Sequence, residues 1–486
     1  MSRATPVRTF AALGLSIASF ATLQSLVVPV LPLIQTDLHT STSGATWAMT
    51  AWLISAAVAT PLLGRVGDLV GKRRIFLIAA AAVALGSLIA ATAPTIGVLI
   101  IARVIQGLGG AMFPLAFGLL REAFPPKRVP SAIGAMSALL AVGSGLGTVL
   151  AGPLAGALGW RGLFLVPLVL NVAGAILVAL FVPESRERAR GRVNVPAAIL
   201  LSGWLVALLL PLSNAPQWGW GSPAVIGPLV AAAVLLAAWV LVELRSRGPL
   251  VDMRMMLSPG IWPMNAAAVL IGATMFGVFG FFPRFVQTPA STGYGLGATV
   301  AQSGLLMLPM LVTMGVSGFL SGPLARFIGF RTQVASAAAL VAGSTALIGL
   351  FHAEPWQLAL EAGIFGLGMG LGYAAITSVV VQSVPPTQTG IASGMNTNLR
   401  TIGSSIGVSV MTAIITSTAG ADGLPSEAGY STGFLTIATI GAGAVVVAIV
   451  GGLIGRRAIR ADSERIETTA ESPFGGSEVE LEPEAA

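Results

Sequence analysis

The sequence predicts an all-α polytopic membrane protein in which two pseudo-symmetric six-helix bundles are joined by two inserted helices, giving 14 transmembrane helices. Three observations predict this fold. Of the 486 residues, 55% are hydrophobic and 9% are charged, and a water-soluble protein cannot bury so much apolar surface. Apolar runs of about 20 residues recur along the chain, the length at which a helix crosses a bilayer. The second half of the chain also repeats landmarks of the first half.

The individual helices follow from the hydropathy of the chain. Fourteen apolar segments stand out, and an even number of spans places both termini on one side of the membrane. The first segment follows Arg3 and Arg8 and is too long for the core of a signal peptide, so it is predicted to be the first span. The predicted helices cover residues 8–33, 45–64, 75–93, 97–120, 130–158, 161–182, 195–213, 223–243, 260–287, 299–324, 332–353, 356–383, 391–418 and 432–454.

The positions of Lys and Arg orient these helices. Of the 26 basic residues, 22 lie at the two termini or in every second connection, whereas the connections on the other side contain only Arg161. An excess of Lys and Arg marks the cytoplasmic side, so both termini are expected in the cytoplasm of a multi-pass plasma-membrane protein. The remaining three fall within predicted spans and are Arg103, Arg284 and Arg400.

An internal repeat divides the chain. GRVGDLVGKR from Gly64 aligns with GPLARFIGFR from Gly322, QGLGGA at 106–111 with FGLGMG at 365–370, and residues 124–147 with 384–407, at offsets of 258, 259 and 260. Three matches in nearly constant register indicate duplication. The predicted domains are an N-terminal six-helix bundle at 1–183, a two-helix insertion at 184–259, a C-terminal six-helix bundle at 260–455 and a disordered cytoplasmic tail at 456–486. The tail holds eight of the 19 acidic residues.

Several classes of function do not fit the sequence. No cysteine is present, so disulfides are excluded, and the net charge of +7 is scattered over short loops, which does not indicate a nucleic-acid partner. Neither lysine lies in the G-x-x-x-x-G-K-[ST] context of an ATP-binding loop. His39 and His352 lack the spacing of metal ligands, and no nucleophile has an evident base. We therefore expect no metal, no cofactor, no ATP and no enzymatic activity.

These landmarks resemble the major facilitator superfamily from about residue 10 to residue 455, and the fourteen helices are similar to its drug:proton antiporter branch. The resemblance rests on the signature of the helix 2–3 connection in GRVGDLVGKRR, on the helix-4 signature in LIIARVIQGLGGA and on the helix-5 antiporter signature in GSGLGTVLAGPLAGALGW. SGMNTNLRTIGSSIG at 393–407 is also similar to this branch. One position departs from the pattern: the aspartate that the branch carries in helix 1 is replaced by Leu23 or Gln24.

The helix 2–3 connection is predicted to gate the transporter. Its glycines let helix ends approach closely, and Asp68 can accept hydrogen bonds from amides at a neighbouring helix N-terminus or pair with an adjacent arginine. Such contacts form in one conformation and break in another. The alternative is an ordinary basic loop on the cytoplasmic side, which explains the cations but not the embedded acid. The predicted gating residues are Gly64, Asp68, Gly71, Lys72, Arg73 and Arg74.

Three residues are candidates for proton coupling. Arg103 lies inside helix 4, where a charge is costly unless it faces a cavity or a partner. Its alternative role is structural, bonding to backbone carbonyls. Glu361 is the carboxylate within a span and away from its cytoplasmic end, and its alternative role is that of an interface residue. Asp37 is the next candidate.

Polar and aromatic residues inside other helices are predicted to line a substrate cavity. The aromatic residues among them can equally lie at the lipid interface. The predicted cavity residues are Gln24, Trp52, Gln106, Phe276, Phe279, Phe282, Asn396, Asn398 and Arg400. Small residues spaced by four in helix 5 permit close helix contact, and a proline among them bends the helix. This predicted hinge consists of Gly143, Gly147, Gly152, Pro153 and Gly156.

The resemblance implies a secondary active transporter working by alternating access. It implies export of amphipathic, drug-like compounds in exchange for protons, and thereby antibiotic resistance. The expected partners are a small-molecule substrate, protons and the lipid bilayer, and the protein is expected to be a monomer. Two alternatives stay open: a facilitator or proton symporter for a small metabolite, and a membrane receptor or scaffold that transports nothing.

Overall fold

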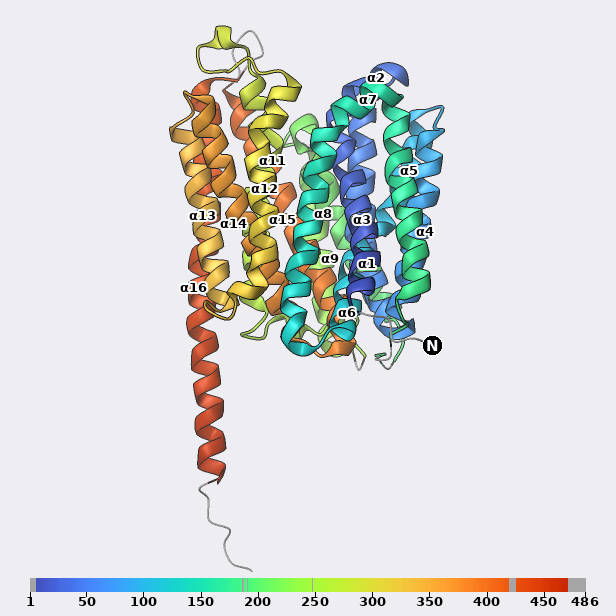
Figure 1. Cartoon of the computed structure of the whole chain (residues 1–486), viewed down its shortest axis with the longest axis vertical. Helices are drawn as coiled ribbons and strands as arrows, with labels where there is room; N and C mark the ends of the chain where they lie inside the picture. Colours follow the sequence, from blue (N-terminus) through green and yellow to red (C-terminus); the bar gives the residue numbers. More distant parts are fainter. Residues whose placement is uncertain (1–5, 186–187, 190, 247, 419–424, 471–486) are drawn as a thin grey trace, which may run out of the picture.

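The protein is a long bundle of helices, described here by a computed structural model covering residues 6–185, 188–189, 191–246, 248–418 and 425–470 (Figure 1). Fourteen helical segments of this described part are long and apolar enough to cross a membrane, which confirms the predicted all-α polytopic fold. The α-helices are α1 (Pro6–Leu26), α2 (Leu31–Asp37), α3 (Thr42–Val70), α4 (Lys72–Ala91), α5 (Ile96–Gly107), α6 (Met112–Ala123), α7 (Val129–Phe181), α8 (Val195–Trp218), α9 (Pro223–Arg245), α10 (Met253–Met256), α11 (Trp262–Gln287), α12 (Val300–Leu324), α13 (Phe330–Leu350), α14 (Pro355–Gln382), α15 (Thr389–Ser417) and α16 (Glu427–Ala470).

The helices differ from the predicted spans at three places, for reasons that follow from their sequences. The first span ends as α1 at Leu26, and the prolines of the following VPVLP segment start a 3₁₀ turn and α2. The fourth span is α5 and α6, separated by a 3₁₀ turn over the glycine-rich stretch Leu108–Ala111. The fifth and sixth spans form one element, α7, which turns back at Gly159, where φ is +69° and ψ is 170°. Glycine suits this turn because the left-handed region is strained for other residues.

Buried side chains gather in three groups. One group is built almost wholly from residues of α1–α7 and a second from residues of α11–α16. The third joins α8 and α9 to Ala57 of α3 and to Ile391 and Met395 of α15. The Ser409 hydroxyl on α15 also donates a hydrogen bond to the Leu212 carbonyl of α8, at 2.8 Å. The inserted helices therefore lie across the line where α3 meets α15.

Glycines allow close contact between the two halves along this line, which we call the α3/α15 seam. A Cβ on Gly390 would lie 2.6 Å from the Gly64 carbonyl oxygen, and a Cβ on Gly394 would lie 3.1 Å from the Cα of Pro61. Further along, the Asn398 side-chain amide donates to the Ala57 carbonyl at 2.6 Å. We call the end of the bundle that holds Gly64 and Gly390 the inner end; it also holds the N-terminus and the extension of α16 (Figure 1). At this end the halves are in contact.

The C-terminal part differs from the prediction of a disordered tail. Helix α16 continues to Ala470, so residues 456–470 are helical and extend beyond the bundle (Figure 1), whereas 471–486 lie outside the described residues. The physical reason is local, because no glycine or proline interrupts 456–470 and most of its residues are good helix formers. The domain limits otherwise stay a prediction.

Candidate functional site

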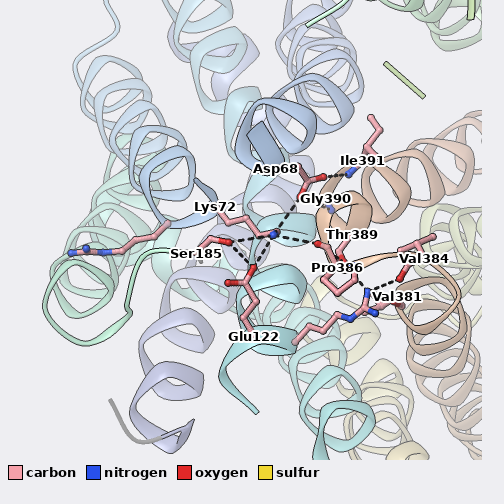
Figure 2. A network of polar contacts seen from close by, with 12 residues as sticks. Asp68, Lys72, Glu122, Ser185, Val381, Val384, Pro386, Thr389, Gly390 and Ile391 are labelled. Atoms are coloured by element: carbon pink, nitrogen blue, oxygen red, sulfur yellow. Dashed lines mark hydrogen bonds and ion pairs between the residues drawn. The ribbon is translucent and has the colours of Figure 1, made fainter. Parts of the chain in front are cut away.

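Asp68 lies at the α3/α15 seam and caps the first turn of α15 from the other half of the molecule (Figure 2). Its Oδ1 accepts a hydrogen bond from the Gly390 amide at 3.3 Å, and its Oδ2 accepts one from the Ile391 amide at 3.1 Å. The first amides of a helix have no partner within the helix, and Gln388, the N-cap residue of α15, makes no side-chain cap hydrogen bond. The carboxylate supplies the missing acceptors, and its charge is favourable at the positive end of the helix dipole.

The glycines of this stretch explain how Asp68 reaches α15. Gly64 packs against Gly390, as described above, one turn before Asp68 on the same helix. Gly71 is the single residue between α3 and α4, with φ at +135°, a value that L side chains rarely adopt. A Cβ on Gly71 would also lie 2.7 Å from a carboxylate oxygen of Glu184. Gly64 therefore lets α3 approach α15 closely, and Gly71 allows the sharp turn between α3 and α4.

Lys72 follows Gly71 and is completely buried. Its Nζ lies 2.8 Å from Glu122 Oε1 and 3.6 Å from Asp68 Oδ1. It also donates to the Ser185 hydroxyl and, across the seam, to the Pro386 carbonyl, each at 3.4 Å (Figure 2). A buried ammonium is tolerated only when charges and hydrogen bonds compensate its desolvation, and Lys72 has both.

Arg121, at the end of α6, makes a second cross-seam contact. Its Nη1 donates to the carbonyls of Val381 at 2.7 Å and Val384 at 2.8 Å and to the Thr389 hydroxyl at 3.0 Å (Figure 2). Val381 is in the last turn of α14, where carbonyls have no donors within their own helix, and Val384 follows the end of that helix, so the guanidinium satisfies carbonyls at the C-terminal end of α14. From the sequence alone, Arg121 counts only as one of the basic residues on the cytoplasmic side, and Glu122 is not among the predicted site residues. The sequence feature that could have pointed to Arg121 and Glu122 is an adjacent Arg-Glu pair at the inner end of a predicted span.

Arg73 and Arg74 contact the end of α7 and the segment just after it instead of the seam. Their backbone amides donate to Glu184 at 3.1 and 3.2 Å, so Glu184 caps the start of α4. The Arg73 guanidinium donates to the Ala179 carbonyl, and Arg74 is exposed. Of the predicted gating residues, Gly64, Asp68 and Lys72 lie at the seam, Gly71 shapes the turn, and these two arginines lie away from it.

Two further charged residues, Arg65 of α3 and Glu243 of the insertion, lie near this region. Arg65 is nearly buried and interacts electrostatically with both Asp68 and Glu243 of α9. Glu243 itself accepts hydrogen bonds from the amides of Leu250 at 2.8 Å and Val251 at 3.1 Å. The sequence does not mark Glu243 as an interior charge, because it lies at the inner end of its span.

Arg103 is fully buried within the N-terminal half. Its Nη1 donates to Gln106 Oε1 at 2.8 Å and its Nε to the Ala48 carbonyl at 3.3 Å, while the guanidinium lies 5.3 Å from the Trp52 ring. Gln106 donates onward to the Ser87 hydroxyl at 3.0 Å. Arg103, Trp52 and Gln106 thus pack together in the core of one half, an arrangement that fits the structural alternative for Arg103, and the proton-coupling role stays a prediction.

The two candidate proton carriers have opposite environments. Glu361 on α14 is 4% exposed, and its Oε2 has no hydrogen-bond partner. Asp37 lies outside the spans and accepts hydrogen bonds from Trp160 Nε1 at 2.9 Å and Arg161 Nη1 at 2.5 Å. The Trp160 bond, followed by the Arg161 bond, lowers the pKa of Asp37 below its usual 3.8. These hydrogen bonds favour the charged form of Asp37, whereas nothing among the described residues stabilises a charge on Glu361 Oε2.

The other predicted cavity residues do not form one cluster. Asn396 donates to Asn265 Oδ1 at 3.0 Å inside the C-terminal half, whereas Asn398 bonds across the seam to Ala57. Arg400 donates to the Tyr373 hydroxyl. The remaining four differ in burial: Gln24 on α1 and Phe276 and Phe279 on α11 are half-buried, and Phe282 is buried.

The predicted hinge residues of α7 divide into two groups. A Cβ on Gly143 would lie 2.8 Å from the Ala18 carbonyl oxygen of α1, and Gly147 packs equally closely on Thr22. Among the described residues, no atom lies within 4 Å of a Cβ placed on Gly152 or Gly156, so this part of the structure shows no close helix contact there. The sequence shows the spacing of these glycines but not which face of α7 meets α1. The break in α7 lies at Gly159, beyond Pro153.

Comparisons with known proteins place this geometry in a family. Residues 13–408 match the family model of the Major Facilitator Superfamily. The chain belongs to the Major Facilitator Superfamily. Members of this superfamily are secondary transporters of small molecules, so the chain is a multi-pass membrane transporter and not an enzyme.

Two curated relatives of this Major Facilitator chain are bacterial. The Tetracenomycin C resistance and export protein of Streptomyces glaucescens is 29% identical over 83% of this chain and 75% of its own length. The Multidrug resistance protein Stp of Mycobacterium tuberculosis is 32% identical over 79% of this chain and 71% of its own length. A crystal structure of the human organic anion transporter MFSD10 (TETRAN) matches with a TM-score of 0.63, covering 92% of this chain and 99% of that one. Its identity is 18%, so this likeness concerns the fold alone.

Proposed function

We propose that the protein exports amphipathic, drug-like organic compounds in exchange for protons, by alternating access across the plasma membrane. In this proposal both termini are cytoplasmic, the inner end faces the cytoplasm, and the protein acts as a monomer that makes the cell resistant to antibiotics. The distribution of Lys and Arg supports the orientation. The names of the two bacterial relatives, one a resistance and export protein and one a multidrug resistance protein, support the class of substrate.

The observation that carries the proposal is the buried network at the inner end of the α3/α15 seam. Asp68, Lys72 and Arg121 belong to the first half, and each bonds to a backbone or side-chain group of the second half. Alternating access requires the halves to part on one side of the substrate while they meet on the other. These bonds exist only while the inner end is closed, so they bias the equilibrium between the two states by their free energy.

Exchange for protons requires a group that binds a proton inside the membrane, and we assign this role to Glu361. Its carboxylate is buried, its Oε2 has no hydrogen-bond partner, and none of the ion pairs among the described residues includes it. A buried carboxylate without compensation is costly when charged, and a bound proton removes that cost. With Glu361 as the proton carrier, the proton binds in the second half of the protein. Transport then does not need the helix-1 aspartate that this chain lacks.

Reconstituted transport tests the proposal. Substrates are first selected by an efflux panel in a pump-deficient host, and the purified protein is then assayed in proteoliposomes with an imposed pH gradient. We expect the gradient to drive transport, and we expect Glu361→Gln to bind substrate but to lose this drive. Glu354→Gln, which changes an exposed carboxylate at the start of the same helix, is the matched control and should transport normally.

The other outcomes identify the alternatives. Transport that runs down the substrate gradient and ignores pH would indicate a facilitator. Failure to transport any compound of the panel would indicate a receptor or scaffold. Normal pH-driven transport by Glu361→Gln would show that another group carries the proton.

A further inference from the structure

Arg400 is a cation near the middle of the membrane. It lies in α15 about 16 Å from the start of that helix, roughly half of the ~30 Å thickness of the hydrocarbon core. A charged arginine at this depth is costly to insert, so interior arginines usually serve a function or have a partner. The partners of Arg400 therefore indicate its role.

The guanidinium of Arg400 is held by a tyrosine at the boundary of the two halves. Its Nη2 donates to the Tyr373 hydroxyl at 2.6 Å, and its central carbon lies 3.8 Å from the centre of the Tyr373 ring. Gly272 of α11 leaves room for the side chain, because a Cβ there would lie 2.9 Å from Arg400 Cγ. Tyr373 belongs to α14, yet its buried ring packs with the core of the N-terminal half. Arg400 is thus directed toward the region between the halves.

No carboxylate among the described residues pairs with Arg400. The ion pairs in this part of the chain are Lys72 with Asp68 and Glu122, Arg161 with Asp37, and His352 with Glu427. Glu361 lies on the same helix as Tyr373 but about 18 Å further along it. The other interior carboxylates, Asp68, Glu122 and Glu243, lie at the inner ends of their helices.

The first half adds no negative charge at this depth. Where the antiporter branch has an aspartate, this chain has Leu23 or Gln24, and the nearest acid along the chain, Asp37, lies outside the spans. Arg103 adds a second interior cation. The centre of the membrane region is therefore positive, and a cationic compound placed there meets like charge.

From this geometry we propose that Arg400 and Tyr373 form an anion-binding subsite, so that the exported compounds are organic anions. This rests on the proposed export function. A guanidinium has five N–H donors in a planar fork that matches a carboxylate, and Tyr373 accounts for one of them by the hydrogen bond described above. Arg400 is half-buried, and among the described residues its guanidinium makes no side-chain hydrogen bond besides the one to Tyr373, so its other donors are left for a ligand. The bound acid supplies the negative charge that the protein itself lacks, and the Tyr373 ring offers an apolar surface beside it.

Three probes with one aromatic skeleton test the subsite: anthracene-9-carboxylate, its neutral carboxamide and the corresponding trimethylammonium compound. Their binding to the purified full-length protein is measured by fluorescence titration, and their uptake is measured in proteoliposomes. We expect the carboxylate to bind at least about tenfold more tightly than the other two, in line with one charge-assisted bidentate contact. Arg400→Gln should abolish this preference by weakening the binding of the carboxylate probe while leaving the binding of the other two probes unchanged. Arg400→Lys should restore part of the preference.

Arg284→Gln is the matched control, because Arg284 is also an arginine of a span that lies over an aromatic ring, Phe281, at 5.5 Å, but it is exposed. We expect this variant to keep the preference for the carboxylate. Equal binding of the three probes by the unchanged protein would overturn the subsite, and this measurement needs no variant to fold. An unaltered preference in Arg400→Gln would overturn the role of Arg400. Carboxylate binding without export would leave the subsite intact and contradict the proposed function instead.

Discussion

Replacing Asp68 by Asn should open the inner end of the transporter. Asp68 accepts two backbone hydrogen bonds across the seam, and each bond to a charged group contributes about 1.5–3 kcal/mol when buried. Asn retains one acceptor oxygen but not the charge, so it loses one such bond and the interaction with the positive end of α15. We therefore expect the closed inner end to lose about 2 kcal/mol relative to the open one, which changes the population ratio roughly 30-fold.

The chain contains no cysteine, so a single introduced cysteine reports this shift without background. Ser393 of α15 is buried near the inner end, and Ser393→Cys is a small change. We expect this cysteine to react with a maleimide faster in the Asp68→Asn background, while substrate turnover falls and the yield of folded protein stays the same. Arg326→Gln is the matched control, because Arg326 occupies the position of Asp68 in the second repeat but is exposed.

The labelling rate of this cysteine decides whether Asp68 stabilises the closed inner end. If it is the same with Asp68 and with Asn, and transport is normal, then the cross-seam hydrogen bonds do not bias the conformational equilibrium. The stretch would then serve only to orient helices α3 and α4. A similar shift in the Arg326→Gln control would show that any charge change in these connections has this effect, and it would refute the specific role of Asp68.

Two further predictions follow from the same geometry. Gly390→Ala should keep the inner end from closing, because the new Cβ would lie 2.6 Å from the Gly64 carbonyl oxygen. We expect faster maleimide labelling of Ser393→Cys in this variant. Gly152→Ala is the control and should leave the labelling rate unchanged, because its new Cβ would meet no described atom within 4 Å. Asp37 has a lowered pKa in the folded protein, so its stabilising effect is complete above the unfolded value of 3.8 and is lost as the pH falls through the folded value. The melting temperature in detergent should therefore fall less steeply in this acidic range for Asp37→Asn than for the unchanged protein; parallel curves would refute the role of Asp37.

Some assignments depended on residues whose partners are far away in the sequence. An acid among cations makes Asp68 conspicuous in the sequence. The sequence does not reveal the amides that Asp68 binds, because they lie more than 320 residues further on. Arg73 and Arg74 share the same short motif, yet they contact the end of α7 and the segment just after it. Arg121 looked like any other basic loop residue, although it reaches across the seam. No local pattern distinguishes these cases, because the rotation of each helix decides which side chains meet.

The sequence by itself determined the class of the protein, the fourteen spans and the two-fold repeat. The class and the spans depend on properties that act along one helix at a time, apolar length and the number of cations at helix ends, and the repeat is visible as matching stretches at a nearly constant offset. The tertiary structure alone decided which charges form the seam, that Arg103 belongs to a core while Arg400 lies between the halves, and that the inserted helices cover the α3/α15 seam. Those features are set by the packing of helices against one another, and packing depends on pairs of residues that hydropathy does not relate.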